Sequence, residues 1–272
     1  VRRTAGKEKM ELVLFLVSFL SSTIGTVCGI GGGIVMKPLL DTLHLASAAT
    51  ISFLSGCTVF SMSCYSVCKA LQKRESLIAL KTGTPLSLGA ALGGITGSRL
   101  FGLAADISKQ PEKVGGIQAV CLAVITLLTL LYTLLQDTIK THTLKSPLPC
   151  GVVGLCLGTL SGFLGIGGGP VNLVVLHFFF SMPAKIAAQN SLYIILVSQA
   201  ASILTTLLSQ RLPAFRLIWL GIMVGGGILG GKAGRILNRR LSEKQTKIML
   251  EWMIFLIFCI CCYHAGVVLV SK

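Results

Sequence analysis

Acidic residues are scarce in this chain. Nine Asp and Glu stand against 24 Lys and Arg, and none of the nine lies clearly in the middle of an apolar run, Glu251 being the closest. A proton-driven pump with a buried carboxylate relay normally carries such a residue. The sequence therefore argues against a carboxylate-based proton relay.

Catalytic and metal-binding patterns are also missing. No nucleophile stands beside a base, and no His or second Cys pair lies at metal-site spacing, so we predict neither an enzyme nor a metal centre. The run Cys259-Ile260-Cys261-Cys262 is interpreted as small apolar filler in a packed or lipid-facing helix. Neither glycine-rich segment continues into the Gly-Lys-Ser/Thr of a phosphate-binding loop, so nucleotide binding is not predicted.

Charge of both signs is low, and long apolar runs take its place. Only 12% of the residues are charged, where a soluble domain has roughly 25%. Hydrophobic residues make up 53%, and the mean hydropathy is +0.83. Apolar runs such as Ile117 to Leu135 and Ile248 to Val270 are bounded by short polar loops. The pattern predicts an all-α, polytopic integral membrane protein, because a soluble bundle would lack the polar surface to cover such a core.

The net charge of +15 sits mainly in loops and at the ends of apolar segments. Cations in these places fit membrane topology and anionic headgroups, so membrane lipid is an expected partner. No aromatic residues interleave with a basic patch, and nucleic acid is therefore not an expected partner. The excess of positive charge could also attract an anionic solute.

Glycine, by contrast, is abundant, and the pentapeptide Gly-Ile-Gly-Gly-Gly occurs twice, at 29–33 and 165–169. Each copy lies inside a long apolar stretch. A glycine in a helix interior costs about 1 kcal/mol relative to Ala, and backbone groups released inside a membrane must find other partners. The two copies therefore predict a helix broken at equivalent places in two halves, which indicates a site built from backbone.

The two halves match beyond this pentapeptide. Ala48–Ser52 resembles Ala187–Ser191, and Gly93–Gly97 resembles Gly230–Gly234, in the same order along the chain. Matches in one order predict an internal duplication. We divide the chain into a basic N-terminal segment, a first transmembrane repeat, a linker and a second transmembrane repeat, at 1–11, 12–136, 137–147 and 148–272.

Each repeat is predicted to hold four elements, which gives about eight transmembrane spans. The first element of each half is broken by glycine, so it could be a kinked span, a re-entrant hairpin or two crossings. An even number of crossings per half makes the repeats parallel and an odd number makes them inverted, and the sequence leaves both open. The expected elements are 12–43, 48–70, 78–104 and 114–136, followed by 148–180, 186–208, 214–238 and 246–270.

The third element of each half carries glycines four residues apart. This spacing places glycine on one helix face, where another helix can approach closely. We therefore expect tight helix packing, and no binding site, at Gly89, Gly93 and Gly97, and at Gly226, Gly230 and Gly234.

The glycine breaks themselves are candidates for an anion site. A half-helix that begins inside a membrane presents backbone N–H groups and the positive end of its dipole, both of which favour an anion. Two facing breaks would supply six or more donors. The alternative is that the pentapeptide is only a hinge for close packing. The predicted donors are Gly31, Gly32, Gly33, Gly167, Gly168 and Gly169.

Polar residues near the breaks could add side-chain donors. Hydroxyl and amide groups suit an oxyanion, and a polar run is costly in hydrocarbon unless it forms hydrogen bonds inside the bundle. The alternative is interhelical hydrogen bonding or N-capping. The candidates are Thr50, Ser52, Asn172, Gln189, Asn190 and Ser191.

Lys37 is the one cation close to a glycine break in the sequence. It could add charge to an anion site, or its side chain could extend from a short helix to the lipid headgroups. Its counterpart in the second half is Leu173, so it is not part of the repeated plan. Arg99 and Arg235 lie late in the third elements and are interpreted as marking a membrane interface.

The two glycine motifs, the first followed after four residues by Pro38, resemble those of the TauE/SafE family of sulfite exporters and sulfonate-uptake permeases. The resemblance covers nearly the whole chain. It implies a duplicated helical bundle that transports small sulfur oxyanions or organosulfonates and holds no bound cofactor. The second copy has Val174 where the first has Pro38, and Ile51-Ser52 and Asn190-Ser191 stand where the family often has Thr-Ser. These departures leave the selectivity open.

Together, these features predict a secondary transporter of a small anion, sulfite-like or sulfonate-like, that works by alternating access around the two glycine breaks. Two alternatives remain open at this point. One is an anion channel or uniporter, and the other is a non-transporting membrane scaffold or assembly factor. The choice of membrane and the oligomeric state are not predicted from the sequence.

Overall fold

The described residues fold into helices joined by short connections. A computed structural model describes residues 2–42, 46, 48–72, 77–108, 111–144, 146–164, 168–208 and 213–270, and no strand occurs among them. The predicted all-α class is therefore confirmed for this part of the chain. The helices are α1 (Arg2–Cys28), α2 (Gly33–Thr42), α3 (Ala48–Gln72), α4 (Leu80–Ser108), α5 (Pro111–Leu135), α6 (Pro147–Leu164), α7 (Pro170–Phe180), α8 (Ala184–Leu208), α9 (Leu217–Arg240) and α10 (Glu243–Val270).

Six stretches of the described helices are long and apolar enough to cross a membrane. Frequent Gly, Ser and Thr in α4 lower its hydropathy, and α5 contributes the shorter apolar stretch Val120–Leu135. Apolar side chains such as Leu12, Leu16 and Leu20 point outward, where hydrocarbon would cover them. The six stretches are Lys9–Cys28, Thr50–Gln72, Pro147–Leu164, Ala184–Leu208, Leu217–Arg240 and Glu243–Tyr263.

Both predicted helix breaks are present. The first helix of one half ends at Cys28 and the next begins at Gly33; in the other half the corresponding ends are Leu164 and Pro170. Gly29, Gly31, Gly168 and Gly169 have φ values of 73°, 69°, 123° and 67°, a region that L-residues with a Cβ rarely adopt. Residues 165–167, and with them the predicted donor Gly167, lie outside the described residues.

The α6–α7 pair is a hairpin that enters and leaves the bundle at the same end. The backbone N–H of His142, which precedes α6, donates to the carbonyl oxygen of Phe178 near the end of α7, at 2.7 Å. The N–H of Leu144 donates to the carbonyl of Phe179 at 2.9 Å. These bonds tie the start of the hairpin to its finish.

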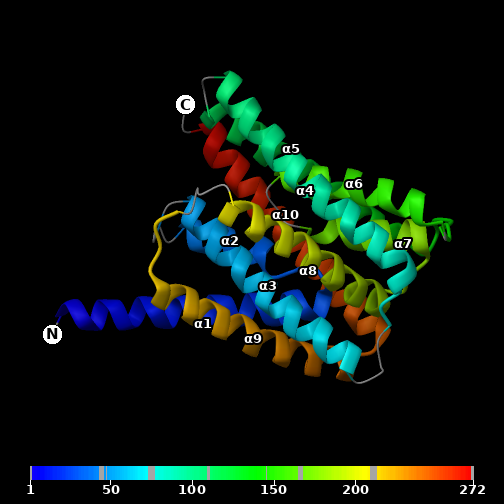
Figure 1. The fold of residues 1–272 in the computed structure, drawn as a ribbon, viewed down its shortest axis with the longest axis horizontal. Helices are drawn as coiled ribbons and strands as arrows, with labels where there is room; N and C mark the ends of the chain where they lie inside the picture. Colours follow the sequence, from blue (N-terminus) through cyan, green and yellow to red (C-terminus); the bar gives the residue numbers. More distant parts are fainter. Residues whose placement is uncertain are drawn as a thin grey trace.

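The α1–α2 pair also folds back on itself. Met36 and Leu40 of α2 pack in one buried cluster with Leu14 of α1 and Ile51 of α3. The short helix therefore returns along α1 to the end of the bundle at which α3 begins. In Figure 1 this end lies to the left, where α1 and α3 begin and α8 ends, whereas α6 and α8 begin on the right.

The glycine-rich third elements pack against parallel helices, as their spacing predicts. A Cβ atom on Gly93 of α4 would lie 2.2 Å from the carbonyl oxygen of Leu155 in α6, and one on Gly230 of α9 would lie 2.4 Å from that of Phe19 in α1. Gly97 makes the same approach to Thr159 at 2.1 Å. Real Cβ atoms do not come so close, so only glycine allows these backbones to touch.

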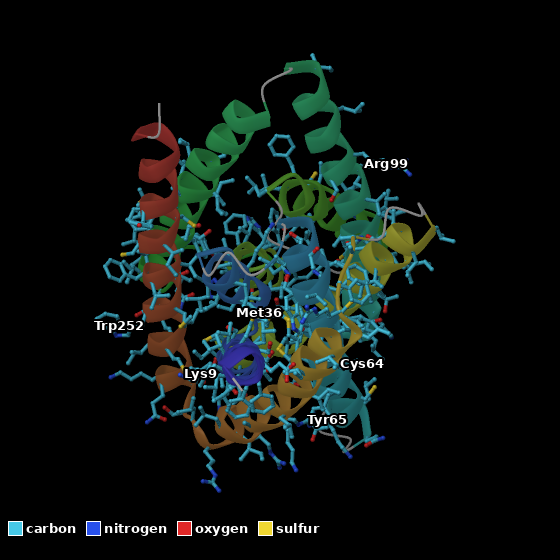
Figure 2. The ribbon with its side chains drawn as sticks, turned by 90° about the vertical axis from the view of Figure 1, so that its left-hand side faces the viewer. Lys9, Met36, Cys64, Tyr65, Arg99 and Trp252 are labelled. Atoms are coloured by element: carbon cyan, nitrogen blue, oxygen red, sulfur yellow. The ribbon has the colours of Figure 1, made fainter. Side chains whose placement is uncertain are left out.

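The remaining helices surround this core. The two central helices, α3 and α8, run antiparallel and contact each other, while α3 also packs on α9 and α8 on α4. On the outside, α5 packs on α10. Figure 2 shows Trp252 of α10 directed away from the bundle, and 68% of this residue is exposed. The interior therefore lies between the hairpins, α3, α4 and α8.

The close glycine packing gives a direct stability test. We expect Gly230→Ala to lower the melting temperature in detergent, because overpacking of a tight contact costs about 1–3 kcal/mol. Gly225→Ala, in the same helix, is the matched control, since no neighbouring atom lies within 4 Å of its added Cβ. That variant should melt at the wild-type temperature or slightly above it. Equal melting temperatures for the two variants would contradict the packing described here.

Candidate functional site

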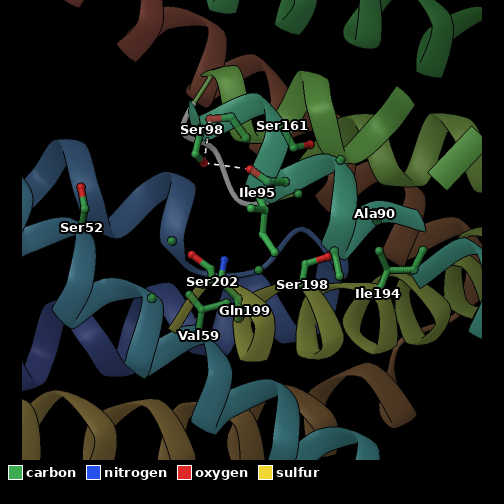
Figure 3. A pocket seen from close by; sticks show the side chains of 18 of the residues that line it. Ser52, Val59, Ala90, Ile95, Ser98, Ser161, Ile194, Ser198, Gln199 and Ser202 are labelled. Carbon is green, nitrogen blue, oxygen red and sulfur yellow. Dashed lines mark hydrogen bonds between the residues drawn. The ribbon is translucent and has the colours of Figure 1, made fainter. Parts of the chain in front are cut away.

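A cavity of about 720 Å³ lies where the two helix breaks meet. Gly31 and Gly33 of the first break line it, together with Gly168 and Asn172 of the second. Helices α3, α4, α6 and α8 supply the rest of the wall, as Figure 3 shows. The structure thus brings together segments that lie far apart in the sequence.

The cavity opens at one end of the bundle. At its deep end, Asn172 is completely buried and Ser161 is 5% exposed. Ser98 and Arg99, late in α4, and Ser202, late in α8, also line the cavity and are exposed. The mouth therefore lies where α4 and α8 end and α3 begins.

One face of α8 is polar along the whole cavity. In Figure 3 the side chains of Ser198, Gln199 and Ser202 face α4 across the cavity from Ile95 and Ser98. This face is not among the residues predicted from the sequence. Its signal is a series of hydroxyl residues spaced three and four apart in an otherwise apolar helix. The polar residues of α8 on this wall are Ser198, Gln199, Ser202, Thr205 and Thr206.

The charge on the cavity wall is positive. Lys37 of α2 and Arg99 of α4 line it, and no Asp, Glu or His does so among the residues that the structure describes. Arg99, interpreted from sequence as a marker of the membrane interface, thus stands at the cavity mouth as an exposed residue. Two cationic side chains on one concave wall can attract an anionic solute.

Asn172 has a polar atom without a partner. Its Nδ2 donates to Ser191 Oγ at 3.4 Å, but its Oδ1 is buried and accepts no hydrogen bond within the described part of the chain. A buried polar atom without a partner costs about 1–3 kcal/mol. Its position on the cavity wall indicates that a water or ligand normally interacts with this amide.

The backbone donors at the two breaks are unequal. The first N–H groups of α2, which begins at Gly33, have no partner within the helix. At the second break, Pro170 has no N–H, and the N–H of Asn172 donates to the carbonyl of Gly169 at 3.3 Å. The second break therefore offers fewer N–H groups to a ligand than the glycine pattern suggests.

Two of the predicted glycine donors lie away from the cavity wall. Gly32 packs against α1, where an added Cβ would lie 2.7 Å from the carbonyl oxygen of Ser21. Gly169 is the N-cap residue of α7, with φ 67° and ψ −157°. Both positions serve the geometry of the break itself. The predicted residues that do line the cavity are Gly31, Gly33, Lys37, Ser52, Gly168 and Asn172.

The amide of Asn190 is used by the backbone. Its Oδ1 accepts from the N–H of Ala79 at 3.0 Å, and its Nδ2 donates to the carbonyls of Leu77 at 3.0 Å and Ile186 at 2.9 Å. It thereby holds the segment before α4 against α8. This is the interhelical bonding that we raised as the alternative for the polar run.

The other predicted side-chain donors also lie off this wall. Thr50 Oγ1 donates to the carbonyl of Ala214 at 3.0 Å, which joins α3 to the segment before α9. Ser191 is buried beneath Asn172 and reaches the cavity only through that amide. Gln189 lines a second, smaller cavity of about 60 Å³.

The described residues contain no group of three or more His, Cys, Asp or Glu that could hold a metal ion. What the large cavity offers is hydroxyl, amide and backbone groups together with two cationic side chains. Such a wall can bind and orient a small polar solute.

The sequence matches a known family of membrane proteins. The model of one protein family, sulfite exporter TauE/SafE, matches residues 14–260. The chain belongs to this family. It is also similar to the Probable membrane transporter protein YunE of Bacillus subtilis (strain 168), with 23% identity over 271 residues that cover 91% of this chain and 96% of the relative. No solved structure matches.

Membership of the TauE/SafE family makes the protein a membrane transporter. The six apolar helical stretches agree with an integral, multi-pass protein. The family resemblance that the two glycine motifs indicated is thereby confirmed. A solute-sized cavity at those motifs is the natural candidate for the transport site of a TauE/SafE protein.

Access to the cavity can be tested with thiol reagents. We expect Ser202→Cys, at the exposed mouth, to react with a membrane-impermeant methanethiosulfonate above the background of the ten native cysteines. Ser191→Cys, which is fully buried, should stay at background. A negatively charged reagent should react faster at Ser202→Cys than a positively charged one of equal size, because Lys37 and Arg99 line the same cavity. Equal rates would contradict the electrostatic description.

Proposed function

We propose that this TauE/SafE protein is a secondary transporter of a small anion, a sulfur oxyanion or an organosulfonate. The observation that carries the proposal is the polar wall of the large cavity, where Lys37 and Arg99 stand among hydroxyl, amide and backbone groups. The family's description as sulfite exporters supports the choice of sulfur chemistry. Lys37 and Arg99 attract an anion into the cavity. No acidic side chain among the described residues of the wall repels it.

The deep end of the cavity holds the oxyanion in this proposal. The first N–H groups of α2 and the hydroxyl of Ser161 are the donors. Rotation of the Asn172 amide by 180° lets Oδ1 accept from the Ser191 hydroxyl and directs the NH₂ group into the cavity. After this rotation Oδ1 accepts a hydrogen bond, and the anion gains one further hydrogen-bond donor.

We also propose that α1–α5 and α6–α10 are inverted repeats. Each hairpin begins and ends at one end of the bundle, so it adds no net crossing, and three long helices follow it in each half. An odd number of net crossings inverts the second half. The pairing of α4 with α6 has its counterpart in the pairing of α9 with α1, both through glycine. The three long helices that follow each hairpin then cross the membrane, and the α1–α2 and α6–α7 hairpins are re-entrant.

Alternating access follows from this arrangement. The large cavity is open at one end, and inverted repeats can exchange conformations so that the opposite end opens instead. The solute stays near the two breaks while the helices around it rearrange. A channel would need a pathway open at both ends at once, whereas the large cavity opens where α4 and α8 end.

Counterflow in proteoliposomes tests this function. We expect the wild-type protein to exchange labelled sulfite or a small sulfonate, faster with unlabelled anion on the opposite side, without single-channel currents. Arg99→Gln should raise the half-saturating concentration several-fold at low ionic strength, and less at high salt, because the mouth loses a cation that attracts the anion at a distance.

Lys81→Gln is the matched control for Arg99→Gln. Lys81 is an exposed cation of the same helix and lines neither cavity, so its loss should leave exchange within about twofold of wild type. Large unitary currents would favour the channel, and a folded protein that carries none of the anions would favour a scaffold. Equal effects of the two substitutions would contradict the role of the cavity.

A further inference from the structure

The second cavity lies at the opposite end of the bundle from the first. The ends of α1, α3 and α9 and the start of α8 surround it, whereas the large cavity opens at the start of α3 and the end of α8. Its volume is about 60 Å³. It is therefore much narrower than the large cavity of about 720 Å³.

The wall of this small cavity is polar and incompletely bonded. Thr26 and Ser66 line it, are 4% and 5% exposed, and have hydroxyl oxygens with no hydrogen-bond partner among the described residues. Gln189 lines the small cavity as well, and its buried Oε1 also has no hydrogen-bond partner among the described residues. Three such atoms around one space give it the hydrogen-bonding groups that a small polar ligand needs.

Cationic side chains line the small cavity as well. They are Arg235 and Arg239. Nη1 of Arg235 donates to the backbone carbonyl of Ser66 at 2.7 Å, which holds the end of α9 against the end of α3. The polar atoms and the guanidinium groups together have the chemistry of an oxyanion site.

Three residues of the small cavity stand at positions that line the large cavity in the other half of the chain. The register that aligns Gly93–Gly97 with Gly230–Gly234 places Arg235 at the position of Ser98. The register of the second elements places Ser66 at the position of Thr205, and that of the glycine motifs places Thr26 at the position of Gly162. Each of these counterparts lines the large cavity: Ser98, Gly162 and Thr205.

From these observations we infer that the second cavity is a constricted anion-binding vestibule at the opposite membrane face, with Arg235 as its principal ligand. The inference rests on the proposed function, in which an anion crosses between the two ends. When this end opens, the end of α9 moves away from α3 and the bond between Arg235 and the Ser66 carbonyl breaks. The guanidinium then faces a widened cavity, where it binds the anion together with Thr26 and Gln189.

Sulfite exchange in membrane vesicles of both orientations tests this vestibule. We expect Arg235→Gln to raise the half-saturating sulfite concentration about tenfold at the face where α9 ends, and to leave it within about twofold at the other face. Arg235→Lys, which keeps the charge, should restore most of the affinity. Arg240→Gln, an exposed arginine of the same helix that lines neither cavity, should match wild type at both faces.

The outcomes separate this vestibule from the proposed function. Wild-type sulfite exchange with equal behaviour of Arg235→Gln and Arg240→Gln overturns the vestibule and leaves the proposed function standing. A folded wild-type protein that exchanges no sulfite, sulfate or sulfonate overturns both. If Arg235→Gln fails to fold, Gln189→Leu replaces it, since it removes a polar group of the same wall and spares the contact between α9 and α3. The same one-sided loss is then expected, and its absence refutes the vestibule.

Discussion

Backbone N–H and C=O groups have no water to bond with inside a bilayer, and the rest of this structure depends on that constraint. A helix may stop in the membrane interior only where protein or a cavity surrounds the stop. Here both stops lie inside the bundle, at Gly29–Gly33 and just before Pro170. The glycine contacts of α4 with α6 and of α9 with α1 bring the long helices close enough to enclose them. The packing motif and the site motif therefore depend on each other.

Enclosure also explains the character of the cavity wall. Hydroxyl and amide groups would be costly against lipid, but they are tolerated where they line a polar space. Ser198 and Ser202 of α8 face the cavity, while leucines such as Leu204 and Leu207 on the same helix are exposed to the outside. The proposed preference for an anion rests on the composition of this wall, including Arg99 at the mouth, as much as on any single contact.

The helix breaks and the glycine packing could be predicted from the sequence, because the cost of glycine in a helix and its lack of a Cβ are local properties. The fate of the run Gln189-Asn190-Ser191 could not. Successive helical residues point about 100° apart, so the three face a second cavity, the backbone before α4, and Asn172. Only the packing of the whole bundle decides which of them reaches a cavity. The role of Arg99 depends on the same packing.

The most direct measurement of the central claim is to locate a bound anion. Selenite has the shape and charge of sulfite, and its selenium scatters X-rays anomalously, so crystals grown with it report the position of the anion. The account predicts an anomalous peak at the deep end of the large cavity, between Gly33 and Asn172, and loss of that peak when excess sulfite is added. A peak confined to the exposed mouth beside Arg99, or no peak at saturating selenite, would contradict a transport site at the glycine breaks.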